Sequence, residues 1–274
     1  MGKARTMGFR PCRMPVTAPT GGICWQNGAM SPRIAPLSGP AIAFAHRGAK
    51  AHARENTLEA FALALQMGAT GLESDVWVSR DGQAILDHDG VVGPRIRRRP
   101  ISSVDRADLP EHMPTIRELY LTCGPEFELS LDIKDPEAAT PTAQTILTLE
   151  QELGRSIADR VWFCHPDLEK VAEWREVWPQ FKMVHSTRLK HLNDGPERHA
   201  ETLSSAGIHC LNMRQPDWTG GLVTLFHRFE VHCFAWDVNL DRLLAEIFDA
   251  GVDGLYSDHV DRMMAAHEAA YRFT

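Results

Sequence analysis

From residue 41 to the end of the chain, two patterns of apolar residues alternate along the sequence. Short runs rich in β-branched and aromatic residues are typical of buried strands, and longer stretches with apolar residues every three or four positions are typical of amphipathic helices. The expected strands cover residues 41–46, 71–78, 127–133, 160–165, 181–186, 207–213, 231–238 and 254–258. Helices are expected at residues 55–67, 141–153, 167–178, 196–206, 218–229, 240–250 and 260–272.

The expected strands are apolar along most of their length, which is typical of parallel strands buried on both faces. Because eight of them alternate with helices, we expect an α/β protein whose sheet closes into a (β/α)8 TIM barrel. An open doubly wound sheet is the alternative, but no GxGxxG turn follows the first strand. Residues 83–114 break the alternation with an extended piece at 83–88 and an arginine-rich, proline-containing loop, before a helix at 115–122. We interpret this segment as a short insertion between the second and third barrel strands.

Residues 1–38 differ from the rest of the chain. They carry five lysine and arginine residues, no aspartate or glutamate, frequent proline and glycine, and no apolar periodicity. Such a segment buries too little apolar surface to offset its ordering entropy, so we expect a disordered N-terminal extension, with Met30 a candidate initiator. It lacks the central apolar stretch of about 7–15 residues that a secretory signal needs. One barrel domain is expected at residues 39–274.

Composition and charge narrow the class of protein. The 274 residues include 29 Lys and Arg and 36 Asp and Glu, which gives a net charge of −7. This charge disfavours a nucleic-acid binder and a protein held on anionic membranes by charge alone. No run of about 18 apolar residues predicts an integral membrane segment. The six cysteines form no CxxC motif, so we expect buried free thiols in a reducing compartment and a cytoplasmic location.

A basic cluster lies in the insertion. It has two interpretations: a solvated, salt-bridged face, or a lip that draws anionic substrates or lipid headgroups toward the barrel. The cluster consists of Arg95, Arg97, Arg98 and Arg99.

The carboxyl ends of barrel strands carry the active site of such folds. The second strand contains Glu73 and Asp75, whose i, i+2 spacing directs both carboxylates to one face. Two such carboxylates need compensation, and a divalent cation with Asp132 as third oxygen ligand would supply it. Three carboxylates suit Mg²⁺ or Ca²⁺ better than Zn²⁺. A buried salt bridge to Arg47 or Lys134 is the alternative explanation.

Two histidines and two cations accompany these carboxylates. His46 ends the first strand and His88 ends the extended piece of the insertion, and each could transfer protons near neutral pH. Arg47 and Lys134 would add positive charge at the same rim, suited to phosphate oxygens. Together these residue types indicate a site for a phosphate ester, because fixed cations stabilise charge that grows on the phosphoryl oxygens.

One long stretch, residues 45–89, reads AHRGAKAHARENTLEAFALALQMGATGLESDVWVSRDGQAILDHD. It contains HRG, ENT, an AF…A helix, GA…LE.DV, DG and HD in that order. Further motifs are LSLDIK at 129–134, AWDVN at 235–239 and GVDGLYSD at 251–258. In these motifs the chain resembles the glycerophosphodiester phosphodiesterase family, from residue 41 to about residue 270.

The resemblance implies a TIM barrel with one divalent metal ion, Mg²⁺ or Ca²⁺, with Mn²⁺ as a further candidate. It also implies roles for eight residues: His46 and His88 as general acid and base, Glu73, Asp75 and Asp132 as metal ligands, Arg47 and Lys134 as phosphate contacts, and Trp236 as a lining of the substrate site. Three positions depart from the family pattern. The third ligand is usually Glu, so Asp132 implies a closer metal, a bridging water or a changed ion preference. Arg54 replaces a proline before ENT, and Ser257 replaces a threonine.

The expected function is therefore metal-assisted hydrolysis of glycerophosphodiesters to sn-glycerol 3-phosphate and an alcohol. Water or a neighbouring glycerol hydroxyl could be the nucleophile. Two alternatives stay open: a lysophospholipase D-type hydrolase acting on lysophospholipids, and a non-catalytic phosphate-binding module. The expected partner is a small phosphodiester, and the sequence predicts no oligomeric state.

Overall fold

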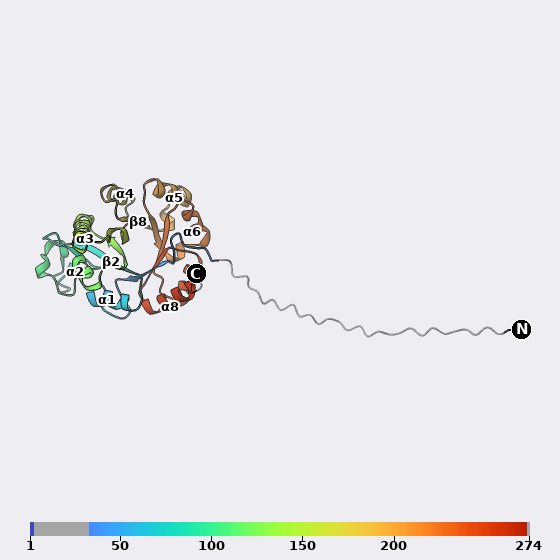
Figure 1. Cartoon of the computed structure of the whole chain (residues 1–274). Helices are drawn as coiled ribbons and strands as arrows, with labels where there is room; N and C mark the ends of the chain where they lie inside the picture. The colour runs from blue at the N-terminus through green and yellow to red at the C-terminus, as the bar shows by residue number, and fades with distance from the viewer. Residues whose placement is uncertain (3–32, 273–274) are drawn as a thin grey trace. The chain divides into compact units, whose positions relative to one another are not determined.

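The computed structural model describes residues 1–2 and 33–272, and eight parallel strands form its centre. Neighbouring strands pair in the order β1, β2, β6, β7, β8, β9, β10, β11, and β11 pairs with β1, which closes the barrel. Figure 1 shows the helices around these strands. This confirms the predicted TIM barrel. The barrel strands are β1 (Ile42–His46), β2 (Gly71–Val78), β6 (Glu128–Ile133), β7 (Val161–His165), β8 (Lys182–Thr187), β9 (Cys210–Arg214), β10 (His232–Trp236) and β11 (Gly254–Ser257).

Helices surround the barrel, and each begins within a few residues of the position that the apolar pattern predicts. Local capping helps to fix these starts: the Thr57 side chain accepts a hydrogen bond from the Ala60 amide at the start of α1, and Thr115 and Glu118 form a capping box at α2. The helices are α1 (Leu58–Gln66), α2 (Ile116–Cys123), α3 (Ala139–Leu153), α4 (Leu168–Val177), α5 (Pro196–Ser205), α6 (Gly220–His227), α7 (Asp241–Asp249) and α8 (Val260–Tyr271).

Alternate residues of the strands fill two apolar layers. The larger layer lies between the strands and the helices, and the smaller one fills the barrel interior. In the interior, Phe44 stacks on Tyr256 with ring centroids 4.8 Å apart and meets Phe234 edge-on at 5.3 Å. Cys164 and Cys210 also belong to this interior layer and are free thiols, as expected from the sequence. This packed interior forms the floor below the carboxyl ends of the strands.

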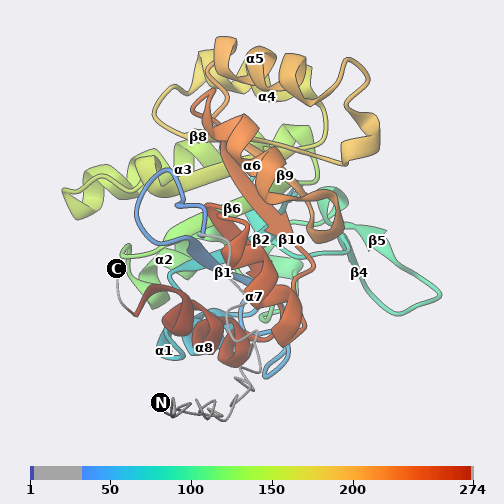
Figure 2. The same cartoon turned by 90° about the vertical axis from the view of Figure 1, so that its right-hand side faces the viewer.

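The segment between β2 and β6 leaves the barrel and returns. Its first strand, β3 (Ala84–Leu86), pairs antiparallel with the end of β2. A two-stranded hairpin follows, with β4 (Val91–Val92) and β5 (Arg99–Pro100), and Figure 2 shows the connecting loop projecting from the body. The periodicity could not predict this hairpin, because each arm has two residues.

The described part of the chain resumes at Arg33, ahead of the predicted boundary at residue 39. Ile34 packs against the barrel core, and the Leu37 amide donates to Asp253 Oδ1 at 2.6 Å. Residues 3–32 lie outside the described residues, so the disordered extension stays a prediction. No helix in the described part of the chain is long and apolar enough to cross a membrane.

Candidate functional site

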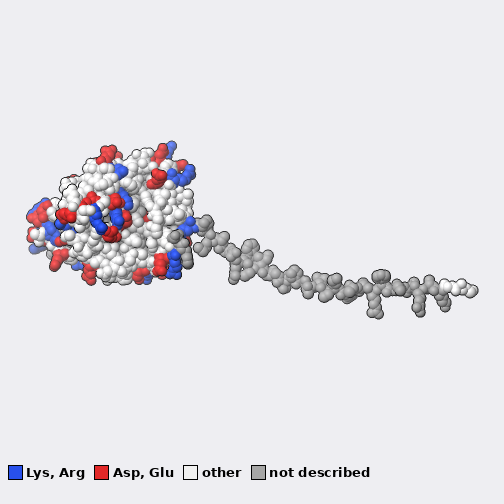
Figure 3. Space-filling model, viewed as in Figure 1, with Lys and Arg blue, Asp and Glu red and all other residues white. Residues whose placement is uncertain are grey.

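A cavity of about 470 Å³ opens at the carboxyl ends of the strands. Charged side chains of both signs gather around a hollow on the face seen in Figure 3. Seven of the eight site residues predicted from the sequence line this cavity, and His88 does not. The lining residues are His46, Arg47, Lys50, Glu73, Asp75, Ser130, Asp132, Lys134, Cys164, Ser186, Asn212, Trp236, Asp237, Asn239, Tyr256 and Asp258.

His46 is held by carboxylates on both sides of its ring. Its Nδ1 lies 2.5 Å from Asp258 Oδ1, and its Nε2 lies 3.8 Å from Glu73 Oε2. Burial opposes protonation, but the charge of Glu73 and the hydrogen bond to Asp258 outweigh it and raise the pKa of His46. The imidazolium form of His46 is thereby stabilised, and Asp258, which directly follows β11, fixes the orientation of the ring.

Three carboxylates from two adjacent strands line one side of the cavity. The register of β2 and β6 places Asp75 directly beside Asp132, and Glu73 lies two residues earlier on β2. Burial, together with the neighbouring carboxylates, raises the pKa of Glu73 to about 7 against the opposing effect of His46. Burial also raises the pKa of Asp132. Such a group is electrostatically costly and calls for positive charge.

Two cations contact these carboxylates. Lys134 Nζ lies 3.1 Å from Asp75 Oδ1 and also bonds Asp132 Oδ2. Arg47 Nε lies 3.3 Å from Asp75 Oδ2, yet neither atom has a hydrogen-bond partner among the described residues. The Arg47 amide donates to Glu73 Oε2 at 2.9 Å, aided by a positive φ of 54° at Arg47. The salt bridges that the sequence left as an alternative are thus present within the same cluster.

His88 is the predicted residue that stands apart. The Asp87 amide donates to the Asp75 carbonyl at 3.1 Å. His88, the next residue, therefore comes directly after the edge of the site. The His88 ring is 40% exposed and bonds its neighbour Asp89 through Nδ1 at 2.9 Å. The catalytic role of His88 stays a prediction.

Trp236 separates the cavity from a second one of about 620 Å³, which it also lines together with Ser186. Two guanidinium carbons lie over its ring, that of Arg188 at 5.9 Å and that of Arg214 at 5.8 Å. Each arginine is also ion-paired, Arg188 with Asp217 and Arg214 with Asp237. These contacts hold the indole between the two cavities.

Sequence reasoning missed the residues that orient the predicted ones. Asp258 bonds His46, and its second oxygen lies 3.5 Å from Lys50 Nζ. The Asn239 side chain accepts from the Asp258 amide at 2.8 Å and so fixes the backbone beside it. The position of Asp258 directly after the last barrel strand was the available signal.

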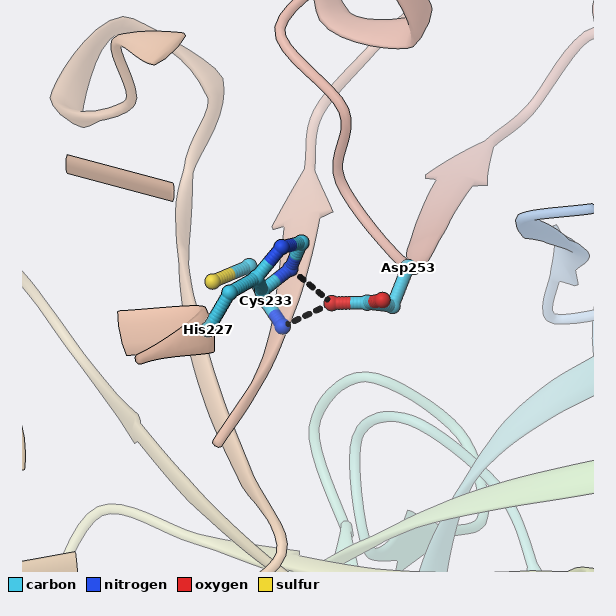
Figure 4. A group of neighbouring side chains, drawn as sticks. All are labelled: His227, Cys233 and Asp253. Atoms are coloured by element: carbon cyan, nitrogen blue, oxygen red, sulfur yellow. Dashed lines mark hydrogen bonds and ion pairs between the residues drawn. The ribbon is translucent and has the colours of Figure 1, made fainter. Parts of the chain in front are cut away.

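Figure 4 shows a second polar cluster. It lies where the strands begin, because Cys233 is the second residue of β10 and Asp253 directly precedes β11. Among the described residues, His227, Cys233 and Asp253 are the one set of three His, Cys, Asp or Glu donor atoms found within 4.8 Å of one another. Asp253 Oδ2 accepts from the Cys233 amide at 2.7 Å and lies 2.8 Å from His227 Nε2. Its other oxygen accepts from Leu37. Because both oxygens are already bonded, we interpret this cluster as a structural anchor for residues 33–38.

Comparisons with known proteins agree with this geometry. The chain is 24% identical over 242 residues to a glycerophosphodiester phosphodiesterase from Bacillus altitudinis, covering 82% of this chain and 97% of that protein. Its fold resembles the crystal structure of a glycerophosphodiester phosphodiesterase from Thermotoga maritima, with a TM-score of 0.68, 24% identity, and coverage of 82% and 97%. It also resembles an Oleispira antarctica phosphodiesterase solved with the product sn-glycerol-3-phosphate, with a TM-score of 0.71, 20% identity, and coverage of 83% and 96%. A sequence profile matches residues 46–262, and the chain therefore belongs to the glycerophosphoryl diester phosphodiesterase family.

Proposed function

We propose that this chain is a phosphoric diester hydrolase that cleaves glycerophosphodiesters to sn-glycerol 3-phosphate and an alcohol. The observation that carries the proposal is the cavity itself, in which His46, held by two carboxylates, lies beside the cations Arg47 and Lys134. The family membership and the product bound to the Oleispira antarctica relative support the same substrate class.

The residue types at this side of the cavity also suit a divalent metal ion, although in the described structure no three oxygens of Glu73, Asp75 and Asp132 lie within 4.8 Å of one another. Members of the family generally depend on such an ion. Glu73, Asp75 and Asp132 offer carboxylate oxygens, which are the ligands that Mg²⁺ and Ca²⁺ prefer. Asp75 Oδ2 is buried without a hydrogen-bond partner among the described residues, and burial together with the neighbouring carboxylates raises the pKa of Glu73. These three residues would hold the ion, which would supply positive charge to the phosphate oxygens.

The chain's own residues account for the remaining chemistry. Arg47 and Lys134 bind the non-bridging phosphate oxygens and keep the phosphorus close to His46. His46 exchanges a proton at Nε2, while Asp258 on Nδ1 keeps the ring in the required tautomer. His88 serves as the opposite member of the acid–base pair. One histidine of the pair takes the proton of the nucleophile as its oxygen bonds to phosphorus. The P–O bond to the alcohol breaks, and the other histidine gives its own proton to the departing alkoxide.

The second cavity favours a polar alcohol over an acyl chain. It adjoins the catalytic cavity at Trp236 and Ser186 and is lined mostly by polar side chains, among them His185, Arg188 and Arg198. An acyl chain would displace water from this polar lining without forming hydrogen bonds in its place, which is unfavourable. We therefore favour water-soluble glycerophosphodiesters over lysophospholipids.

The test is product release from glycerophosphocholine and glycerophosphoethanolamine, with lysophosphatidylcholine in parallel. Each is assayed after chelation and after addition of Mg²⁺, Ca²⁺ or Mn²⁺. We expect metal-restored cleavage of the two diesters, which Asp75→Asn abolishes and the surface control Asp159→Asn preserves. Cleavage of the lysolipid alone would favour the lysophospholipase D alternative. A folded protein that turns over none of the three would refute the proposal.

A further inference from the structure

The tip of the β4–β5 hairpin, residues 93–98, combines an exposed apolar side chain with a run of arginines. Ile96 is 95% exposed, the highest value among the large apolar side chains between residues 33 and 272. Every residue of the tip is exposed, and the hairpin projects from the body of the domain (Figure 2). A fully exposed isoleucine at the end of a protruding loop contributes nothing to the core of its own chain.

The charge of the tip is largely uncompensated. Arg95, Arg97 and Arg98 belong to the tip, and Arg99 begins β5. Among the described residues, the one ion pair that these four arginines form is the long contact of 4.0 Å between Arg98 and Asp89. Many arginines elsewhere in the described structure form closer pairs, such as Arg117 with Glu152 at 2.8 Å. The tip therefore presents a local positive field on a chain whose net charge is −7.

The base of the hairpin, in contrast, is firmly packed. Val92 and Ile101 are buried in a small core of their own beside Trp77. The Ile101 amide donates to the Gly90 carbonyl at 2.9 Å, and the Arg97 amide donates to the Pro94 carbonyl at 2.7 Å. A fixed base and a turn with internal hydrogen bonds hold Ile96 outward, so its exposure is a property of the folded hairpin.

We propose that this tip docks the protein on an anionic lipid bilayer. The arginines would be attracted to anionic headgroups, and Ile96 would enter the boundary between headgroups and acyl chains. The negative remainder of the chain would be repelled from the same surface, which favours contact through the hairpin alone. A single-stranded nucleic acid fits the tip less well, because such partners stack on aromatic side chains and residues 93–98 contain none.

The hairpin begins directly after His88 and Asp89, at the edge of the candidate active site. Docking would therefore bring this edge to the membrane, where diesters derived from phospholipids arise. That consequence rests on the proposed function, whereas the docking itself does not.

The test is co-sedimentation of the full chain with two kinds of vesicle, phosphatidylcholine alone and phosphatidylcholine mixed with phosphatidylglycerol. We expect binding to the mixed vesicles only, weakened by high salt. The double variant Arg95→Gln/Arg97→Gln should lower the partition coefficient about 30-fold, from about fivefold per arginine. Ile96→Ser should lower it about five- to tenfold.

Two matched controls remove an exposed arginine or an exposed apolar side chain outside the hairpin tip. Arg228→Gln neutralises an exposed arginine at the end of α6, and Leu121→Ser removes an exposed leucine from α2, and both should bind as the unaltered chain does. Three results would each overturn the proposal: no binding to the mixed vesicles, equal binding to both kinds, or binding that the tip variants leave unchanged. A loss with Arg95→Gln/Arg97→Gln but none with Ile96→Ser would contradict the entry of Ile96 into the bilayer and indicate a contact made by charge alone. Because no result depends on turnover, failure here is distinct from failure of the proposed activity.

Discussion

Gly48, directly after His46 and Arg47, is a position where the structure allows only glycine. Its φ is +77°, in the left-handed region, and the Ala49 amide next to it donates to the Ala60 carbonyl of α1 at 2.9 Å. A Cβ built on Gly48 would lie 2.7 Å from the Ala60 carbonyl carbon and 2.9 Å from the Ala60 oxygen. Gly48→Ala must therefore strain the backbone and push α1 away from the strand end that carries the site.

The magnitude follows from these two effects. A left-handed conformation costs an alanine about 1–2 kcal/mol relative to glycine. Overpacking against a backbone adds about 1–3 kcal/mol. The free energy of unfolding should fall by about 2–5 kcal/mol, which corresponds to a drop in Tm of about 5–15 °C in a domain of this size.

Gly82 provides the matched control. Its φ is +79°, nearly the same, but a Cβ there would meet no atom within 4 Å. Gly82→Ala should lose only the conformational part, with a Tm about 2–6 °C lower. Thermal unfolding by circular dichroism, with turnover of a glycerophosphodiester measured below both Tm values, separates the two effects. Equal destabilisation by both variants would refute the argument that contact with Ala60 decides the cost.

Three further predictions concern single contacts. Asp258→Asn should lower kcat about 10- to 100-fold with little change in KM, because His46 loses the charged partner of its Nδ1; an unchanged kcat in steady-state assays would contradict this. Arg47→Lys should raise KM for the diester about tenfold, because an ammonium cannot replace the forked guanidinium, and saturation kinetics would show it. His209 accepts a hydrogen bond from the Met183 amide through Nδ1, and burial lowers the pKa of His209 from 6.5 to about 4. Neutral His209 therefore stabilises the fold fully above pH 6.5, and this stabilisation is lost as the pH falls toward 4. His209→Asn keeps an acceptor that does not titrate, so the loss of stability between pH 7 and pH 5 should shrink by about 1–2 kcal/mol in denaturant titrations, and an identical loss would show that His209 does not contribute.

The barrel could be predicted from the sequence because the same pattern, an apolar run, recurs once for every strand. Each of the eight strands is a separate apolar run, and the rule that parallel strands place their carboxyl ends together brings Glu73, Asp75 and Asp132 into one cavity without any knowledge of distance. The register that pairs Asp75 with Asp132 agrees with this placement, and the roles of the three residues stay predictions.

The other features of the site and of the hairpin depend on three-dimensional contacts, which the periodicity of apolar residues does not predict. The pairing of His46 with Asp258 joins the first and last barrel strands, 212 residues apart, and exists only because the barrel closes. The place of His88 is set by a three-residue strand and a turn, which are too short to give a pattern. The exposure of Ile96 likewise depends on how the hairpin packs at its base.

The most direct test of the central claim is turnover of a glycerophosphodiester by His46→Ala, with Mg²⁺ or Ca²⁺ present. His52→Ala is the control, because His52 lies in the following loop, bonds Asp261 and does not line the cavity. If His46 transfers a proton in a hydrolytic site, kcat falls at least about 100-fold in His46→Ala, while Tm stays near that of the unaltered chain and His52→Ala remains active. Full turnover by a folded His46→Ala protein would contradict the account.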